Sequence, residues 1–275
     1  MSRLAPVISI SHGGGPMPLL GDPSQAEITH SLKTKVPEIL KIGTPEQPKA
    51  IVLVTAHWST DKVAISSAEK HKLYYDYSGF PPETYTLKYD APGSAEVAGL
   101  VEGVLKDAGI ESKKDDKRGW DHGVFVPMML IHPAATIPIV QLSVLRSESP
   151  ATHYKIGEAL ASLRSQNIAI VGSGFASLHN IRLIFSGMTT NPDFVKLNEE
   201  WSGLVTDAAQ TEGVEERGRK FEGWRKWKGA WDMHPRGGAE HFLPLIVCAG
   251  AGGEGKAKAW KDDVWNLPMW SYYWE

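Results

Sequence analysis

Residues 7–15 read VISISHGGG, and residues 50–58 read AIVLVTAHW. Each stretch contains a run of β-branched and aliphatic residues that leads into a histidine. This pattern is typical of strands buried on both faces of a parallel sheet. Ligands of such sheets bind beyond the carboxyl ends of the strands. His12 and His57 are therefore predicted to meet at one point, where two imidazoles indicate a divalent metal ion. The alternative is that both histidines only satisfy local hydrogen bonds where their loops begin.

The bulk composition limits the class of protein. The chain has 275 residues, of which 42% are hydrophobic and 22% charged, and its formal net charge is −3. These values favour a single α/β domain over residues 1–275. The charge balance shows no excess of basic residues that would indicate nucleic-acid binding, and the sequence contains no apolar run long enough to span a membrane. The first predicted strand leaves no room for a signal peptide, and the single cysteine, Cys248, excludes an internal disulfide. We therefore expect a cytoplasmic protein.

Predicted strands and helices alternate along the chain without an internal repeat. We expect an α/β fold with a central, largely parallel or mixed sheet flanked by helices. Ser94 is the expected N-cap of one helix, and Pro37 weakens the prediction for the middle of another. Further strands are predicted at residues 62–67, 137–144 and 168–171, and helices at residues 24–42, 94–108, 151–165 and 193–210.

Three other features are interpreted from composition. Residues 74–93 are rich in Tyr, Pro and Gly, and they are predicted to pack over the mouth of a site because plain linkers lack aromatic anchors. Residues 211–229 are rich in charge and are predicted to be exposed. Tryptophans gather late in the chain, which suggests an aromatic lid or wall formed by Trp224, Trp227, Trp231, Trp260, Trp265 and Trp270.

Two more histidines lie in short motifs, residues 120–123 (WDHG) and 177–180 (SLHN). An imidazole near a metal could act as a base, because its unperturbed pKa is about 6.5. The alternative for His122 and His179 is a hydrogen bond to a backbone carbonyl. The remaining histidines considered lack a position at a strand end and are predicted to be surface or packing residues: His30, His71, His132 and His153.

The third metal-ligand candidate lies in residues 240–242 (EHF). Adjacent residues project in different directions, so only one of Glu240 and His241 is expected to reach the ion. Glu240 would complete a two-histidine, one-carboxylate face that suits Fe(II) with open positions. His241 would give three neutral ligands, a set that also accommodates zinc.

Several motifs in this order resemble those of the class III extradiol ring-cleavage dioxygenases, the LigB-like family, and in particular its DOPA 4,5-dioxygenase-like branch. The resemblance extends from residue 8 to about residue 254. It departs from relatives in the spacer at residues 175–178 and in the Trp-rich stretch at residues 221–233. The motifs that carry it are residues 12–13, 56–58, 77–81, 89–93, 120–123, 138–143, 172–174, 179–180 and 240–244.

The resemblance implies a role for each candidate residue. His12, His57 and His241 match metal ligands, with a glutamate in place of the third ligand in more distant members. His179 matches a residue that either belongs to the metal site or acts as the acid/base, and His122 matches one that lines the substrate pocket. The resemblance also implies Fe(II) as the working metal, with Zn(II) possible in the isolated protein. The implied reaction is O₂-dependent cleavage of a catechol to a muconic semialdehyde.

Two other function classes remain open at this stage. A zinc-dependent hydrolase could use the same histidines to activate water. A metal-binding structural or pigment-binding protein would show no reaction with dioxygen. A carboxylate on the substrate could be held by Arg118, Arg182 or Arg236, which the sequence alone does not place. We expect a monomer or small homo-oligomer that has no nucleic-acid or membrane partner.

Overall fold

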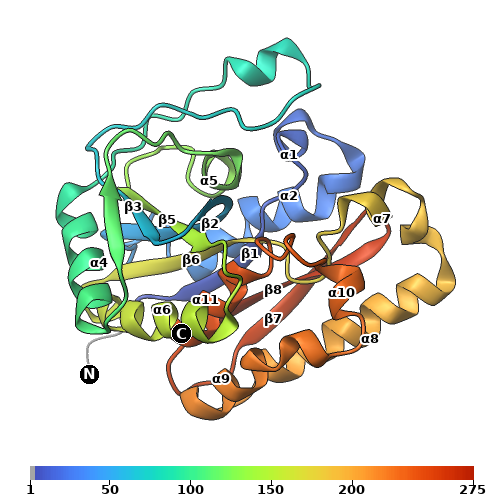
Figure 1. Cartoon of the computed structure of the whole chain (residues 1–275). Helices are drawn as coiled ribbons and strands as arrows, with labels where there is room; N and C mark the ends of the chain where they lie inside the picture. Colours follow the sequence, from blue (N-terminus) through green and yellow to red (C-terminus); the bar gives the residue numbers. More distant parts are fainter. Residues whose placement is uncertain (1–3) are drawn as a thin grey trace.

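The computed structural model describes residues 4–275 and arranges them around one eight-stranded sheet (Figure 1). The strands lie in the order β4–β3–β5–β2–β6–β1–β8–β7. This confirms the expected α/β fold with a mixed central sheet. The strand bounds are β1 Val7–Ser11, β2 Ala50–Thr60, β3 Val63–Ser66, β4 Ser112–Asp115, β5 Ile139–Leu145, β6 Ile168–Gly174, β7 Lys258–Val264 and β8 Leu267–Trp274.

The middle of the sheet is parallel. Strands β5, β2, β6 and β1 pair in parallel, whereas β8 runs antiparallel to β1 and β7 antiparallel to β8. All residues of β1, β5 and β6 are buried, as expected for strands covered on both faces. The carboxyl ends of four parallel strands therefore meet at one edge of the sheet.

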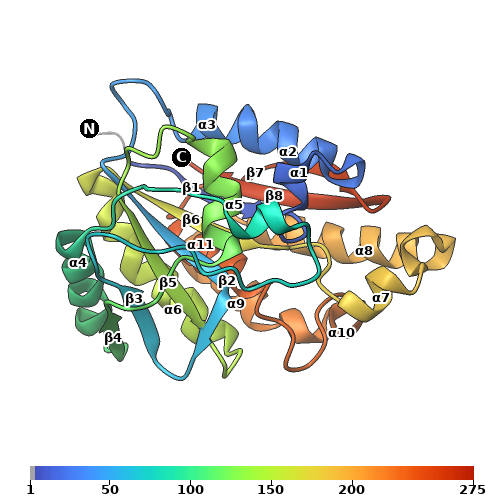
Figure 2. The same cartoon turned by 90° about the horizontal axis from the view of Figure 1, so that it is seen from above.

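Helices cover both faces of the sheet (Figure 2). α2 and α5 pack on one face, where α5 contacts β2 and β6. α11 packs on β6 from the other face and is itself covered by α6. The helix bounds are α1 Met17–Leu20, α2 Ala26–Lys33, α3 Lys35–Ile39, α4 Ala95–Asp107, α5 His122–Ile131, α6 Pro150–Leu160, α7 Ile181–Phe185, α8 Pro192–Ala209, α9 Val214–Glu222, α10 Ala230–Met233 and α11 Leu243–Ala251. No helix between residues 4 and 275 has the length and apolar character needed to cross a membrane.

The helix predicted at residues 24–42 is divided. A short 3₁₀ turn precedes α2, and the backbone leaves the helical region at Thr34, with φ −123° and ψ −66°, before α3 begins. The division places Pro37 in the first turn of α3, where its missing N–H costs no helical hydrogen bond. The Ser94 cap is confirmed, because the Ser94 hydroxyl accepts a hydrogen bond from Val97 N at 3.1 Å.

The prediction that residues 211–229 are exposed is wrong for part of the segment. Arg217, Phe221 and Trp224 are fully buried. The Arg217 guanidinium donates hydrogen bonds to the carbonyl oxygens of Ala249, Thr211, Gly255 and Gly253. A buried cation is tolerated here because backbone carbonyls replace the water it has lost.

Strand β2 and the C-terminal hairpin also differ from the predictions. β2 continues to Thr60, and its pairing with β5 shifts register between Thr55 and Ser59, so His57 lies in the irregular part of the strand. β7 and β8, which no pattern in the sequence had indicated, pair through the turn at Trp265 and Asn266. The hairpin extends the sheet beyond β1.

A buried histidine in α6 makes stability depend on pH. His153 Nδ1 donates to Ser149 O at 2.7 Å, its Nε2 accepts from Leu145 N at 2.9 Å, and burial lowers its pKa to about 4. The unfolded chain therefore binds an extra proton below about pH 6.5, so the free energy of unfolding falls as pH drops, by about 3 kcal/mol near pH 4. His153→Gln keeps one donor and one acceptor, and we expect a flatter slope between pH 6.5 and 4 in urea unfolding. Equal slopes in the two proteins would contradict this assignment.

Candidate metal centre

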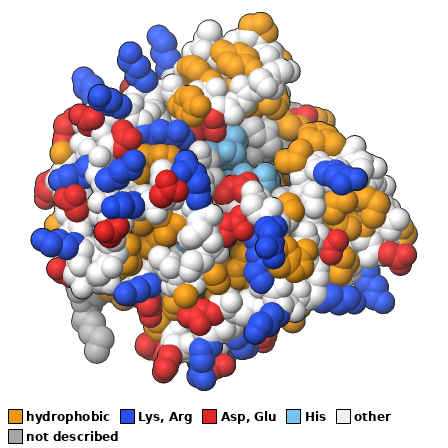
Figure 3. Space-filling model, viewed as in Figure 1, with side chains coloured by type: hydrophobic (Ala, Val, Ile, Leu, Met, Phe, Trp, Pro, Cys, Tyr) orange, Lys and Arg blue, Asp and Glu red, His pale blue; other side chains and the backbone are white. Residues whose placement is uncertain are grey.

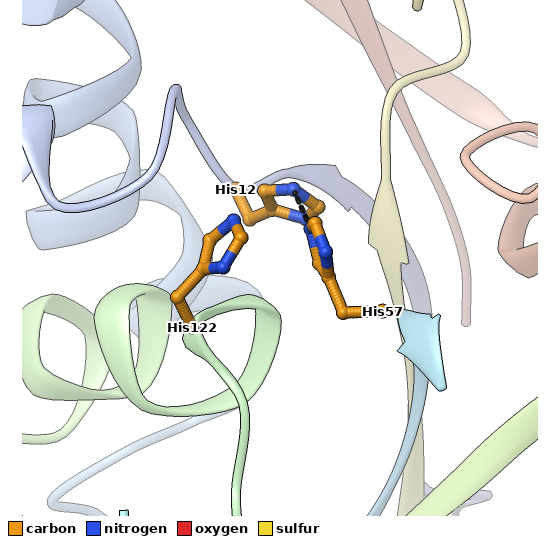
Figure 4. A group of neighbouring side chains, drawn as sticks. All are labelled: His12, His57 and His122. Atoms are coloured by element: carbon orange, nitrogen blue, oxygen red, sulfur yellow. Dashed lines mark hydrogen bonds between the residues drawn. The ribbon is translucent and has the colours of Figure 1, made fainter. Parts of the chain in front are cut away.

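The predicted meeting of histidines at the edge of the sheet is observed. His12 follows the end of β1, His57 lies late in β2, and His122 begins α5, and the three rings face one another (Figure 4). A fourth ring, that of His241, comes from the turn before α11. Its ring centroid lies 4.7 Å from that of His57 and 5.3 Å from that of His12.

His241 reaches this position because its backbone lies against β6. Phe175 N donates to His241 O at 2.9 Å. At Gly174, a β-carbon would stand 2.3 Å from the same carbonyl oxygen, so no larger residue fits there without movement. The glycine at the end of β6 therefore permits the close approach that brings His241 to the strand ends.

Three of the ring nitrogens converge. His57 Nε2 lies 3.2 Å from His12 Nε2 and 3.2 Å from His241 Nε2. Nitrogens bound to one metal ion at about 2.0–2.1 Å with tetrahedral angles stand roughly 3.3 Å apart. Both distances therefore fit nitrogens that bind the same ion, with His57 Nε2 as the atom common to the two pairs.

The outer nitrogen of each ring faces an oxygen. His12 Nδ1 lies 3.0 Å from Ser173 Oγ. The Ser173 hydroxyl donates its own hydrogen bond to Gly123 O at 2.5 Å, so its oxygen is free to accept one from His12. His241 Nδ1 lies 2.9 Å from Glu240 Oε1, and His57 Nδ1 lies 3.4 Å from Asp76 Oδ2. With Nδ1 as the donor, each Nε2 directs a lone pair at the others, an arrangement that repels unless a cation lies between them. Oxygen partners of this kind hold ligand histidines in metal sites.

The electrostatics also favour neutral imidazoles. Burial lowers the pKa of His12 well below its usual value, and the neighbouring histidines lower it further. The same two causes, in the same order, lower the pKa of His241. For His57, burial again lowers the pKa most, and Asp76 only partly opposes it. Metal ligation requires the neutral ring, so the protein already provides the needed protonation state.

Asp76 is a site residue that the sequence analysis missed. Its Oδ1 accepts from His122 N at 2.9 Å and from His122 Nδ1 at 2.8 Å. Burial alone would raise the pKa of Asp76, but the hydrogen bond and charge of His122 outweigh it and the pKa is lowered. One carboxylate therefore orients both His57 and His122. A lone aspartate among the tyrosines of residues 74–77 is the only signal that the sequence offered.

His179 and Glu240 lie on the other side of His241. The His179 ring stacks on the His241 ring with centroids 3.2 Å apart and 15° between the planes. Its Nδ1 lies 3.4 Å from Glu240 Oε1, and burial lowers its pKa to about 4. Burial raises the pKa of Glu240. The predicted candidates thus form two groups that share one centre, His12–His57–His122 and His179–Glu240–His241.

The five histidines line a cavity of about 230 Å³. Figure 3 shows pale-blue histidine side chains in a hollow of the surface. Tyr77 and Phe80 of the aromatic loop line it, which confirms that residues 74–93 reach the site. Trp265 is the tryptophan among the described residues that lines it, whereas Trp224 is buried elsewhere, so the predicted tryptophan wall is wrong for most of its members. The other lining residues are Gly13, Gly14, Gly15, Met17, Phe175, Ile181, Ile184 and Phe185.

Comparisons with known proteins agree with this geometry. The profile of the family described as "Catalytic LigB subunit of aromatic ring-opening dioxygenase" matches residues 6–272. The chain is 48% identical to "Dioxygenase tasH" of Hapsidospora irregularis, over 98% of this chain and 86% of that protein. It is 35% identical to "4,5-DOPA dioxygenase extradiol" of Beta vulgaris, over 96% and 92%. The crystal structure of an uncharacterized protein of Escherichia coli K12 superposes with a TM-score of 0.73 at 28% identity, over 99% of this chain and 100% of that one.

Fold and centre together define an α/β enzyme with a histidine site able to hold one metal ion. The chain belongs to the LigB family, and it is an extradiol aromatic ring-opening dioxygenase. The resemblance inferred from the motifs is thereby confirmed.

Proposed function

We propose that this protein, as a single catalytic domain over residues 1–275, is an Fe(II)-dependent extradiol dioxygenase of catechols. It inserts both atoms of O₂ into the ring to give a muconic semialdehyde, so no further reductant is needed. The observation that carries the proposal is the convergence of three Nε2 atoms, with His57 Nε2 at 3.2 Å from those of His12 and His241. The relatives named as dioxygenases support the same reaction class.

In this proposal His12, His57 and His241 are the metal ligands. Glu240 is assigned to the outer side of His241, because its Oε1 lies 2.9 Å from the Nδ1 of that ring. A bound Fe(II) ion supplies chelation of the catechol oxygens and activation of dioxygen. Three neutral ligands also suit Zn(II), so zinc in the isolated protein is compatible with the site.

The chain's own residues handle the protons. His179 accepts a proton from a catechol hydroxyl, and Glu240, 3.4 Å from His179 Nδ1, stabilises the positive charge that results. His122 in its neutral form donates a hydrogen bond from Nδ1–H to Asp76 Oδ1, so its Nε2 is an acceptor for a hydroxyl in the cavity. Tyr77, Phe80 and Phe175 exclude water and contact the ring.

The test is oxygen consumption by protein reconstituted with Fe(II) without air. We expect one O₂ consumed per catechol opened, and no consumption after a chelator removes the metal. Metal-loaded protein that consumes no O₂ with any catechol of a broad panel would refute the proposal. The zinc-dependent hydrolase considered from the sequence finds no support in the family assignment. A cytoplasmic location and a monomeric or small homo-oligomeric state remain predictions from the sequence.

The carboxylate that orients two of the histidines provides a further test. Asp76→Asn removes the charge next to His57 Nδ1 and His122 Nδ1, and we expect metal affinity or turnover to fall about 10–100-fold. Metal titration and steady-state oxygen uptake measure the two effects. Asp61→Asn is the matched control, because Asp61 pairs with Arg146 at the surface. Wild-type affinity and turnover in Asp76→Asn would contradict the role given to this residue.

A further inference from the structure

We propose that the substrate of this enzyme is a catechol whose ring substituent is uncharged and apolar, and not an amino acid such as DOPA. The inference rests on the proposed function, because it takes the histidine centre as the place where the catechol oxygens bind. It concerns the rest of the cavity, which must accept whatever the ring carries. That part of the cavity is built from side chains of α7, the backbone of the glycine loop after β1, and Trp265 of the β7–β8 turn.

The cavity offers no charged partner. Within the described residues 4–275, no Lys, Arg, Asp or Glu lines it, and its polar lining consists of the five histidines and Tyr77. All five of these histidines have their Nδ1 atoms next to an oxygen of Ser173, Asp76 or Glu240. Tyr77 donates its hydroxyl proton to Thr84 O at 2.6 Å. A carboxylate or ammonium group on the substrate would therefore lose water without gaining an ion pair.

The arginines that could have held a carboxylate are engaged elsewhere or lie outside the cavity. Arg118 Nη2 donates to His57 O at 3.0 Å and to Asp121 Oδ2 at 3.1 Å, and its guanidinium lies 4.7 Å from the centre of the Tyr74 ring. Arg236 lies over the Trp231 ring at 5.2 Å. Arg182 is an exposed residue of α7 and is not one of the residues of this helix that line the cavity, which are Ile181, Ile184 and Phe185.

The rim of the cavity is apolar and uncovered. Phe185 is 81% exposed and Ile181 is 50% exposed, although both line the cavity. Figure 3 shows hydrophobic side chains along one border of the hollow that holds the histidines. A short alkyl or aryl substituent that leaves the centre in this direction would cover these side chains and gain from removing them from water.

Trp265, which forms one wall of the cavity, has an unusual backbone conformation. Trp265 has φ +54° and Asn266 φ +64°; Asn is usual in such hairpin turns, whereas a tryptophan stands at 265 where Asn, Asp or Gly is usual. The indole lies 6.1 Å from the Phe175 ring at 30°, and at Gly14 a β-carbon would stand 2.9 Å from it. A bulky residue kept in the left-handed region beside a cavity indicates a functional constraint. We assign Trp265 to contact with the apolar substituent.

The size of the cavity agrees with this class of substrate. A dry apolar cavity of about 150 Å³ suffices for benzene. The 230 Å³ available here holds one ring with a short substituent, and a longer group would extend over Phe185.

The test compares ligands of matched shape and different charge. 4-Propylcatechol and dopamine have the same number of heavy atoms and differ in a terminal methyl or ammonium group, and DOPA adds a carboxylate. We expect 4-propylcatechol to bind at least ~10-fold more tightly than either charged ligand. Calorimetry would measure this on the Fe(II)-loaded protein without air and on the metal-free protein. Equal or tighter binding of dopamine or DOPA, or no binding of 4-propylcatechol, would overturn the inference.

The failure of the proposed function would look different. Selective binding of 4-propylcatechol without oxygen consumption by any catechol would refute the ring-cleavage reaction and still support the apolar selectivity of the cavity. Oxygen consumption that favours DOPA would support the reaction and overturn the selectivity.

A surface variant tests the direction of the substituent. Phe185→Ala should lower the ratio of kcat/KM for 4-propylcatechol over unsubstituted catechol about tenfold, because the exposed ring would no longer cover the alkyl group. Leu204→Ala is the matched control, since Leu204 is an exposed apolar residue of α8 that does not line the cavity. A ratio unchanged in Phe185→Ala would overturn the proposed direction.

Discussion

His241→Ala is expected to lose the bound metal and, with it, all turnover above background, whereas Glu240→Gln is expected to keep the metal. The reason is geometric. His241 Nε2 is one of the three nitrogens that converge, and Glu240 Oε1 lies behind it, 2.9 Å from Nδ1. Removing the ligand leaves two imidazoles, while removing only the charge behind it lowers metal affinity about 10–100-fold. Metal content per chain after dialysis and a metal titration measure the two outcomes.

The pair of variants separates the two ligand sets that the sequence left open. Both residues are adjacent in the chain and close to α11, so each change perturbs the same part of the fold. Metal lost from Glu240→Gln and kept by His241→Ala would show that the carboxylate is the third ligand. The metal-free forms of both variants should unfold at similar urea concentrations, which guards against a simple folding defect.

His179→Gln is expected to lower kcat by about 10²–10⁴-fold while metal content and catechol binding stay close to wild type. The His179 ring lies against the outer side of the centre, stacked on His241 and 3.4 Å from Glu240, and is not one of the three nitrogens that converge at 3.2 Å. Glutamine cannot accept and release a proton as imidazole does, so the chemical step should slow. Oxygen uptake, metal analysis and anaerobic catechol titration measure the three quantities.

His30→Gln is the control for this variant, because His30 is an exposed residue of α2. Loss of metal from His179→Gln would make His179 a ligand and not the base. Wild-type turnover in His179→Gln would remove it from the mechanism altogether.

Much of the fold could be predicted because the central strands are specified locally. β1, β5 and β6 are short runs of apolar and β-branched residues, and burial on both faces requires such a composition. The hairpin β7–β8 was missed because its pairing places Lys258 opposite Tyr273 and Lys261 opposite Trp270, which hides any simple alternation. The burial of part of residues 211–229 was not predicted, because a sequence shows where a charged side chain lies but not which hydrogen-bond acceptors surround it in the fold. Arg217 is buried only because distant carbonyls, such as Ala249 O at 2.9 Å, face it.

Part of the candidate site could also be predicted from the sequence, and part of it could not. His12 and His57 could be placed together because the ends of parallel strands share an edge, and the motifs around His122, His179 and His241 supplied the rest by resemblance. Asp76 could not be placed, because the path of a long loop across the sheet depends on tertiary contacts such as Tyr75 Oη with Leu87 O at 2.7 Å. The position of Trp265 depends on a turn in a hairpin that the sequence did not reveal.

Because Trp265 belongs to the β7–β8 turn, substrate selection and metal binding depend on different parts of the fold. The histidines are fixed by β1, β2 and the end of β6, and the hairpin meets this assembly through the pairing of β8 with β1. Substitution of residues 265 and 266 can therefore change which substrates fit the cavity, while the metal-binding histidines remain in place. Substrate preference can thus diverge through substitutions in a peripheral turn while the metal-binding residues stay the same. The same turn is the first target for redesign of the substrate range.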